Sequence, residues 1–309
     1  MHRPMVRWVM RIVMSGASGM IGTALSKLLE SRGDEVIRLV RRPAANNKEW
    51  SWDPSAGVLD EAVLDGADAV VNLSGAGIGD RPWTKNRIRV LHDSRLQPTR
   101  TLTAAMGRLG SPPRTFVSQS ASGYYGASRR EVLHEDSAPG EVGVLAPLCV
   151  QWEEAARTAP DGVRVVTPRT GVVLSTQGGA LGPLLPLLKV GLGGPFGNGR
   201  QYWPWITLAD EASALAFLVD SQLEGAVNLC APGLADVNTI VARLAEGFHR
   251  PAFLRVPRPA LRLVLGGLAD ELVMADQAMY PGKLAGAGFT WQHPELRQAV
   301  AWLTSRPGR

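Results

Sequence analysis

Apolar and polar positions follow two distinct patterns along the first 175 residues of this chain. Short apolar runs predict buried strands at residues 12–14, 35–40, 68–73, 114–120 and 164–169. Between them, apolar residues recur at helical spacing and predict helices at residues 21–31, 84–106 and 145–158. This alternation predicts an α/β fold, a Rossmann-like, doubly wound parallel sheet.

The pattern loosens beyond residue 175. Helices are predicted at residues 208–220, 237–248 and 257–273, with a short strand at residues 226–230. We therefore expect one domain, built on the parallel sheet, at residues 1–175 and a smaller C-terminal α/β lobe at residues 176–309.

The first predicted strand runs directly into a glycine-rich turn and the first predicted helix. Gly16, Gly19 and Gly22 let the backbone turn tightly and approach a pyrophosphate, and the helix N-terminus favours the anion. The order of strand, turn and helix makes this signal far more specific than the glycines alone. We predict cofactor contacts at Gly16, Ser18, Gly19, Met20, Ile21 and Gly22.

The second predicted strand ends in two arginines. NAD-binding enzymes usually carry an acidic residue there, which binds the ribose 2′-hydroxyl. Arg41 and Arg42 instead offer guanidinium groups that match a 2′-phosphate. Asp34 and Glu35 lie at the other end of the strand, too far away to compete. We therefore predict NADP as the cofactor in preference to NAD.

Small and polar residues follow the later strands, at the edge where substrate meets cofactor in such a sheet. Further cofactor contacts are predicted at Leu73, Ser74, Gly75, Ala76, Ser118, Pro168 and Arg169. Hydroxyl groups gather after the strand at residues 114–120. They give the candidate catalytic residues Ser120, Ser122, Tyr124 and Tyr125.

Composition is that of an ordinary globular protein, with 309 residues of which 45% are hydrophobic and 20% charged. The net charge of +5 is spread along the chain and suits a phosphorylated small molecule, so we expect no nucleic-acid partner. Two cysteines and five scattered histidines predict no metal site.

The sequence predicts no export signal and no membrane-spanning segment. Residues 2–10 lack the apolar core of a signal peptide, and prolines interrupt the apolar run at residues 181–192. We expect a cytoplasmic protein, with the choice between a monomer and a homodimer left open.

Six segments carry a family resemblance: residues 16–22, 71–75, 120–126, 148–154, 169–174 and 193–202. Together they resemble the extended, atypical short-chain dehydrogenase/reductases of the epimerase family, the proteins called sugar nucleotide epimerase-like. The resemblance covers about residues 10–302, and the tail from about residue 250 looks like the family's own C-terminal module. It implies a Rossmann domain, a small substrate lobe and an NADP-type cofactor.

One departure from the family bears on function. Catalytically competent relatives carry Tyr-x-x-x-Lys early in the helix after the serine-bearing strand, where the lysine lowers the pKa of the tyrosine. Alignment on Glu153 puts Leu145 and Cys149 at these positions, and neither can do that work. Tyr124 or Tyr125 could supply the acid, oriented by the neighbouring serines. The alternative is that both tyrosines only line the cleft.

We therefore predict an NADP(H)-binding, epimerase-like oxidoreductase with an unknown small-molecule substrate, for which a nucleotide sugar is the candidate. Gly199, Arg200 and Tyr202, in a glycine-rich loop, are expected to hold the substrate. The missing tyrosine and lysine favour a second hypothesis, a non-catalytic NADP(H)-sensing regulator with a protein partner.

Overall fold

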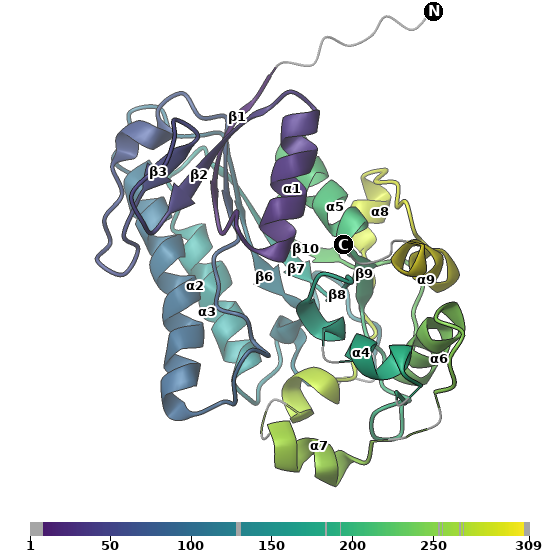
Figure 1. Ribbon diagram of the computed structural model, residues 1–309. Coiled ribbons are helices and arrows are strands. Elements are labelled where there is room, and N and C mark those ends of the chain that lie inside the picture. Colours follow the sequence, from purple (N-terminus) through teal and green to yellow (C-terminus); the bar gives the residue numbers. More distant parts are fainter. Residues whose placement is uncertain are drawn as a thin grey trace, which may run out of the picture.

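The computed structural model describes residues 9–127, 131–182, 184–191, 193–252, 254, 256–265, 267 and 269–305 (Figure 1). In this part of the chain, parallel strands form a continuous sheet in the order β10-β7-β5-β4-β1-β2-β3, and β6 also pairs with β7. The strands of this sheet are β1 (Arg11–Ser15), β2 (Glu35–Val40), β3 (Glu49–Ser51), β4 (Ala69–Asn72), β5 (Thr115–Ser118), β6 (Ser120–Ala121), β7 (Arg164–Thr170) and β10 (Gly225–Leu229). The chain leaves β1 in one direction and returns on its other side at β4, which makes a topological switch point.

Helices cover both faces of the sheet. On one face α1 (Met20–Ser31) packs against α5 (Leu208–Asp220), and on the other α2 (Lys85–Met106) packs against α3 (Leu145–Arg157) (Figure 1). Ile12 of β1 is buried with α1 and α5, whereas its neighbour Val13 is buried with α2. The predicted doubly wound parallel sheet is confirmed.

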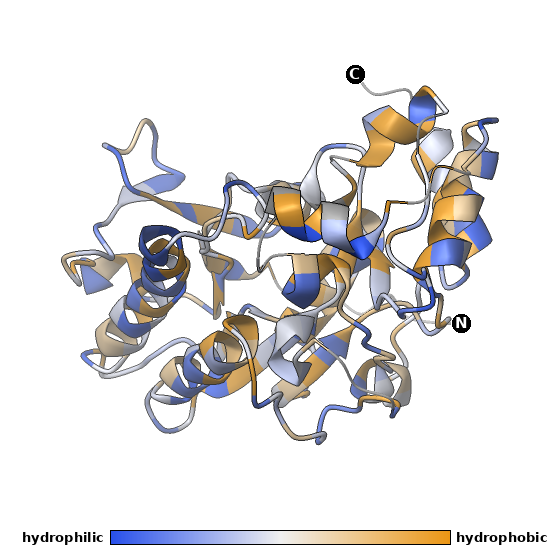
Figure 2. Cartoon of the chain, turned by 90° about the horizontal axis from the view of Figure 1, so that it is seen from below, coloured by the Kyte–Doolittle hydropathy of each residue, from blue (hydrophilic) through white to orange (hydrophobic). Residues whose placement is uncertain are grey.

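The remaining elements form a smaller lobe beside the sheet (Figure 1). They comprise a parallel pair, β8 (Val172–Leu174) with β9 (Trp205–Thr207), and the helices α4 (Leu184–Lys189), α6 (Val237–Gly247), α7 (Arg258–Leu265) and α9 (Leu296–Thr304). The short helix α8 (Gly282–Gly286) packs instead against β10 of the main sheet. Figure 2 shows hydrophobic and hydrophilic residues on different sides of the helices. The lobe has its own apolar cluster, which includes Trp203, Trp205 and Ile240.

A carboxylate ties the C-terminal part of the chain to the sheet domain. Glu271 accepts hydrogen bonds from the backbone N–H groups of Val144 (2.7 Å) and Leu145 (2.9 Å). These groups stand at the N-terminus of α3, where a negative charge is favourable. The C-terminal lobe is therefore anchored beside the start of α3.

Two features of the sheet differ from the sequence expectation. The three-residue strand β3 was not predicted, because it is too short to show a period and forms only by pairing with β2. The predicted strand at residues 226–230 becomes β10 and pairs with β7, so the sheet continues beyond residue 175. The apolar stretch at residues 257–273 is also divided, into α7 and a π-helical turn, Ala269–Val273.

Some expectations concern residues outside the described ranges, namely residues 2–8, 183 and 192. No helix within the described ranges is both long and apolar enough to cross a bilayer. No three potential metal-ligating side chains gather in those ranges either.

A buried carboxyl group gives the first testable prediction. Glu211 of α5 is fully buried, and burial raises its pKa from 4.5 to about 8, while the hydrogen bond from Thr170 opposes the rise. Between these values the folded protein keeps a proton that the unfolded chain releases. The contribution of Glu211 to stability is therefore lost as the pH rises from about 5 to 8.

We expect Glu211→Gln to flatten that part of the pH dependence, since an amide carries no titrating proton. Thermal unfolding of both proteins from pH 5 to pH 9 measures the difference. Glu154→Gln, at an exposed position of α3, is the matched control. Equal pH slopes for Glu211→Gln and wild type would show that Glu211 titrates normally.

Candidate cofactor and active site

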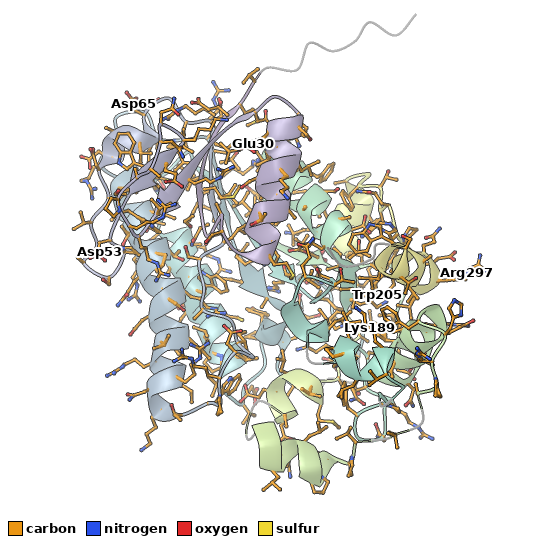
Figure 3. The ribbon with its side chains drawn as sticks, in the orientation of Figure 1. Glu30, Asp53, Asp65, Lys189, Trp205 and Arg297 are labelled. Atoms are coloured by element: carbon orange, nitrogen blue, oxygen red, sulfur yellow. The ribbon has the colours of Figure 1, made fainter. Side chains whose placement is uncertain are left out.

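A cleft of about 1240 Å³ opens at the switch point, between the N-terminus of α1, the end of β2 and the loop after β4. Ligand sites typically measure roughly 300–1,000 Å³, so this cleft suits a molecule as large as a dinucleotide. Glu30 on α1 and Asp53 after β3, both labelled in Figure 3, line it. The predicted cofactor residues found in the lining are Gly16, Ser18, Gly19, Arg41, Arg42, Leu73, Ser74, Gly75 and Ala76.

At each glycine of the turn, the absence of a side chain serves a different geometric purpose. Gly16 has φ +71°, and a Cβ there would lie 2.4 Å from the Leu73 carbonyl oxygen. A Cβ on Gly22 would lie 2.3 Å from the Gly16 carbonyl oxygen, so this glycine lets helix and turn pack together. A Cβ on Gly19, the N-cap of α1, would approach only the Gly16 oxygen, at 3.3 Å. The space beyond Gly19 is therefore open for a ligand at the helix N-terminus.

Basic residues line the opposite end of the cleft. Arg42 forms a bidentate ion pair with Glu49 of β3, with both N–O distances at 2.7 Å. The Arg42 guanidinium lowers the pKa of Glu49 to about 2, so the carboxylate stays charged. Arg38 is paired with Glu30 at 2.6 Å, whereas Arg41 makes no ion pair in the described part of the chain. In that part of the chain, Arg41 is therefore a cation without an ion-pair partner, next to an Arg42 that Glu49 holds in position.

Glu49 is a cleft residue that sequence reasoning missed. It lies on the unpredicted strand β3, and its side chain is only 10% exposed. Other lining residues that were not predicted include Lys27, Arg38, Trp52, Ser94 and Gln97. The alternation of side chains along β2 was the one signal that could have placed Arg38 on the same face as Arg42, four residues later.

Polar side chains fix the strand ends behind the cleft. The Ser15 hydroxyl donates to the Asn72 side-chain oxygen (2.7 Å), and the Ser74 hydroxyl donates to Ser15 (2.9 Å). The Asn72 amide donates to the hydroxyls of Thr99 (2.8 Å) and Ser118 (3.3 Å). This buried network holds the loop after β4 in place, and it engages Ser118 behind the cleft wall.

Several predicted cofactor residues lie outside the lining. They are Met20, Ile21, Gly22, Ser118, Pro168 and Arg169. Gly22 supports the turn, and Met20 packs toward Gly179. Pro168 and Arg169 are buried within β7, where Arg169 is only 2% exposed and pairs with Glu153 through both oxygens, at 2.8 and 2.9 Å. Arg169 thus has a buried carboxylate partner, and a cofactor contact by this residue stays a prediction.

Leu145 and Cys149, which our alignment places at the tyrosine and lysine positions of catalytically competent relatives, lie in the first half of α3. Leu145 and Cys149 are both buried and lie one helical turn apart, facing the turn at residues 122–125. A Cβ added to Gly123 would lie 3.1 Å from Leu145 Cβ and 3.6 Å from Cys149 Sγ. Burial raises the pKa of the Cys149 thiol to about 12, so it remains neutral. Leu145 and Cys149 thus pack against the turn at Gly123 through neutral side chains.

The two candidate tyrosines have different environments. Tyr125 is fully buried, and its hydroxyl bonds to Asn228 (2.6 Å) and Arg169 (3.0 Å). Burial raises its pKa to about 12, so this phenol stays protonated within a buried hydrogen-bond network. Tyr124 is half-buried, and its ring stacks on the Arg169 guanidinium, 3.4 Å from the ring centre. Tyr124 is therefore the more accessible phenol.

The two candidate serines also differ in how deeply they are buried. The Ser120 hydroxyl is buried and donates to Glu153 at 2.8 Å, which places it within the Arg169 ion pair. Ser122 is half-buried beside Tyr124 and leaves its hydroxyl without a bond in the described part of the chain. Ser122 thus has the more accessible hydroxyl of the two.

The glycine-rich loop packs within the C-terminal lobe. Gly199 has φ +72° and lies against Asn238, and the backbone of Tyr202 bonds to Asp276 and Gln277. The side chains of Arg200 and Tyr202 are exposed. The lining of the large cleft does not include Gly199, Arg200 or Tyr202, so a substrate role for them stays a prediction.

Comparisons with known proteins identify the family of this chain. Residues 12–230 match the NAD dependent epimerase/dehydratase family. The chain belongs to this family. Residues 256–303 match a domain of unknown function, DUF1731, which confirms the predicted C-terminal module.

Relatives of this epimerase-family chain match it over nearly their whole length. It is 41% identical to the epimerase family protein Mb2239 of Mycobacterium bovis over 96% of this chain and 98% of the relative. It is 33% identical to the human epimerase family protein SDR39U1 over 94% of this chain and 98% of the relative. A crystal structure of human SDR39U1 with NADPH superposes with a TM-score of 0.89, at 32% identity, over 96% of this chain and 100% of that one.

Proposed function

We propose that this protein binds NADP(H) in the switch-point cleft and acts as an epimerase-like oxidoreductase on a small molecule, with a nucleotide sugar as our candidate. The cleft is the observation that carries the proposal. A glycine turn at the N-terminus of α1 suits a diphosphate, and Arg41 with the fixed Arg42 suits a 2′-phosphate. The NADPH in the structure of the human relative supports the same choice.

Titration of the purified protein with NADPH and NADH tests this proposal directly. We expect NADPH to bind at least about tenfold more tightly, because charge-assisted bonds to a phosphate are the stronger ones. Equal affinity for the two cofactors would refute the proposed preference.

The half-buried phenol of Tyr124 is our candidate for the group that moves a proton. Bound NADPH supplies a hydride to a carbonyl carbon, and the Tyr124 hydroxyl would give its proton to the carbonyl oxygen. The Arg169 guanidinium, 3.4 Å from the ring centre, would stabilise the resulting phenolate. Ser122 would orient the same oxygen by a hydrogen bond. Arg200 and Tyr202 remain our candidates for the distal part of the substrate.

Tyr124→Phe separates catalysis from binding. Turnover should fall by about 10²- to 10⁴-fold, the usual contribution of a positioned acid, while the NADPH affinity stays unchanged. Tyr125→Phe should mainly lower the melting temperature, because it removes buried bonds to Asn228 and Arg169. Turnover that survives the double Tyr→Phe change would show that the acid lies elsewhere.

A second candidate function is a non-catalytic NADP(H) sensor that contacts a protein partner. The buried contact of Leu145 and Cys149 with Gly123 favours it, because no proton-exchanging group remains at that place. A sensor would bind NADPH, oxidise none of it with sugar nucleotides or small carbonyls, and be unaffected by Tyr124→Phe. Two buried, unpaired cysteines suit a reducing compartment such as the cytoplasm under either function.

A further inference from the structure

Helix α2 carries a buried arginine, Arg95, which packs against α3 and the loop after β4. Arg95 is only 7% exposed, and its terminal nitrogens donate to the carbonyl oxygens of Leu91 (3.0 Å) and Ala76 (3.1 Å). Its guanidinium carbon lies 5.2 Å from the centre of the Trp152 ring, and Trp152 is itself held by Thr99 at 3.0 Å. The position of this cation is therefore fixed from several sides.

The charge of Arg95 has no carboxylate partner in the described part of the chain. Two of its five N–H groups donate the bonds to Leu91 and Ala76, and the other three have no acceptor in that part of the chain. Arg169, also buried, differs because both oxygens of Glu153 neutralise it. Burial lowers the pKa of Arg95, although a guanidinium still stays protonated. A buried, uncompensated cation is costly unless a ligand pairs with it.

Arg95 also lies against the wall of the cleft. A Cβ on Gly75 would be 3.2 Å from the guanidinium carbon, so the arginine packs closely against the loop at this glycine. Gly75 and Ala76 line the cleft, and Arg95 stands on their far side, toward Cys149 of α3. This is the neighbourhood where the family's lysine was expected and is missing.

The path of a dinucleotide across the switch point leads to this cation. Arg41 and Arg42 stand at the end of β2, and the glycine turn follows at the end of β1. With the 2′-phosphate on the arginines and the diphosphate on the turn, the other half of the molecule must extend past the loop after β4, toward β5 and α3. We propose that Arg95 binds the nicotinamide half of NADP(H), through the ribose and the phosphate next to it, and so supplies from α2 a charge that α3 lacks.

This inference rests on the proposed binding of NADP(H), and a cofactor fragment separates the two. Adenosine 2′,5′-bisphosphate carries the 2′-phosphate but lacks the nicotinamide half. We expect Arg95→Met to weaken NADPH by about 10- to 100-fold, the range for a lost hydrogen bond to a charged group. The same variant should bind the bisphosphate as wild type does, which also shows that it is folded. Arg95→Lys should recover part of the NADPH affinity.

Control variants show whether Arg95 binds the cofactor or only supports the fold. Arg89→Met, at an exposed position of the same helix, should change neither affinity. Adding Cys149→Lys to Arg95→Met should restore NADPH binding if a cation at this place is what matters. Equal weakening of both ligands by Arg95→Met, or no weakening of either, overturns the proposal. Failure of wild type to bind NADPH overturns the proposed function itself and this inference with it.

Discussion

Gly19→Val is expected to abolish binding of NADPH and NADH alike while leaving the fold intact. A Cβ at this position meets only the Gly16 carbonyl oxygen, at 3.3 Å, so the rest of the valine side chain projects into the open end of the cleft. That space lies at the N-terminus of α1, where the backbone must approach a diphosphate closely. We expect a loss of more than about 100-fold for both cofactors, equivalent to about 2.8 kcal/mol.

Two other glycines make the experiment specific. Gly16→Val should unfold the protein or lower its melting temperature strongly, because the Cβ would lie 2.4 Å from the Leu73 oxygen at φ +71°. Gly110→Val is the neutral control, since no atom lies within 4 Å of a Cβ there. Calorimetric titration and thermal melts of the three variants give the result. Normal NADPH binding by Gly19→Val would place the diphosphate elsewhere.

The double variant Arg41→Ala/Arg42→Ala should lose about 100-fold in NADPH affinity and nothing in NADH affinity. Each arginine offers charge-assisted bonds to a 2′-phosphate, typically worth about 1.5–3 kcal/mol. NADH has no such phosphate. Removing Arg42 also leaves the Glu49 carboxylate in the cleft without its ion-pair partner, so that it repels a phosphate and can accept a bond from a ribose hydroxyl.

Fluorescence titration with both cofactors measures this change in preference. Arg108→Ala is the matched control, because Arg108 also forms an exposed ion pair with a glutamate, Glu61, but lies outside the cleft lining. A uniform loss of both cofactors in the double variant would mean that the arginines support the fold of the cleft and do not read the 2′-phosphate.

Local sequence was sufficient to predict the cofactor cradle. The apolar run of β1, the glycine turn and the amphipathic α1 follow one another directly, so their geometry depends on neighbours in the chain. Arg41 and Arg42 could be placed for a similar reason, since they end a predicted strand next to that turn. The structure puts these residues in one cleft.

Long-range contacts decided the environments of the candidate catalytic residue Tyr125 and the candidate cofactor residue Arg169. Tyr125 and Arg169 are both polar residues at strand ends, and nothing in the local pattern separates them from cleft residues. Only the fold brings Asn228 to the Tyr125 hydroxyl and Glu153 to Arg169, which turns both into parts of a buried network. An arginine on a helix, such as Arg95, likewise appears solvent-facing until α3 and the loop after β4 enclose it.

The sequence by itself determined the order of strands and helices, the phosphate cradle and the arginine pair, because periodicity and turn chemistry act between residues close in the chain. The tertiary structure alone decided that β3 brings Glu49 to Arg42, that β10 extends the sheet, and that Arg95 is buried beside the cleft. Strand pairing, burial and ion pairing join residues far apart in the sequence, and no local pattern records such partners.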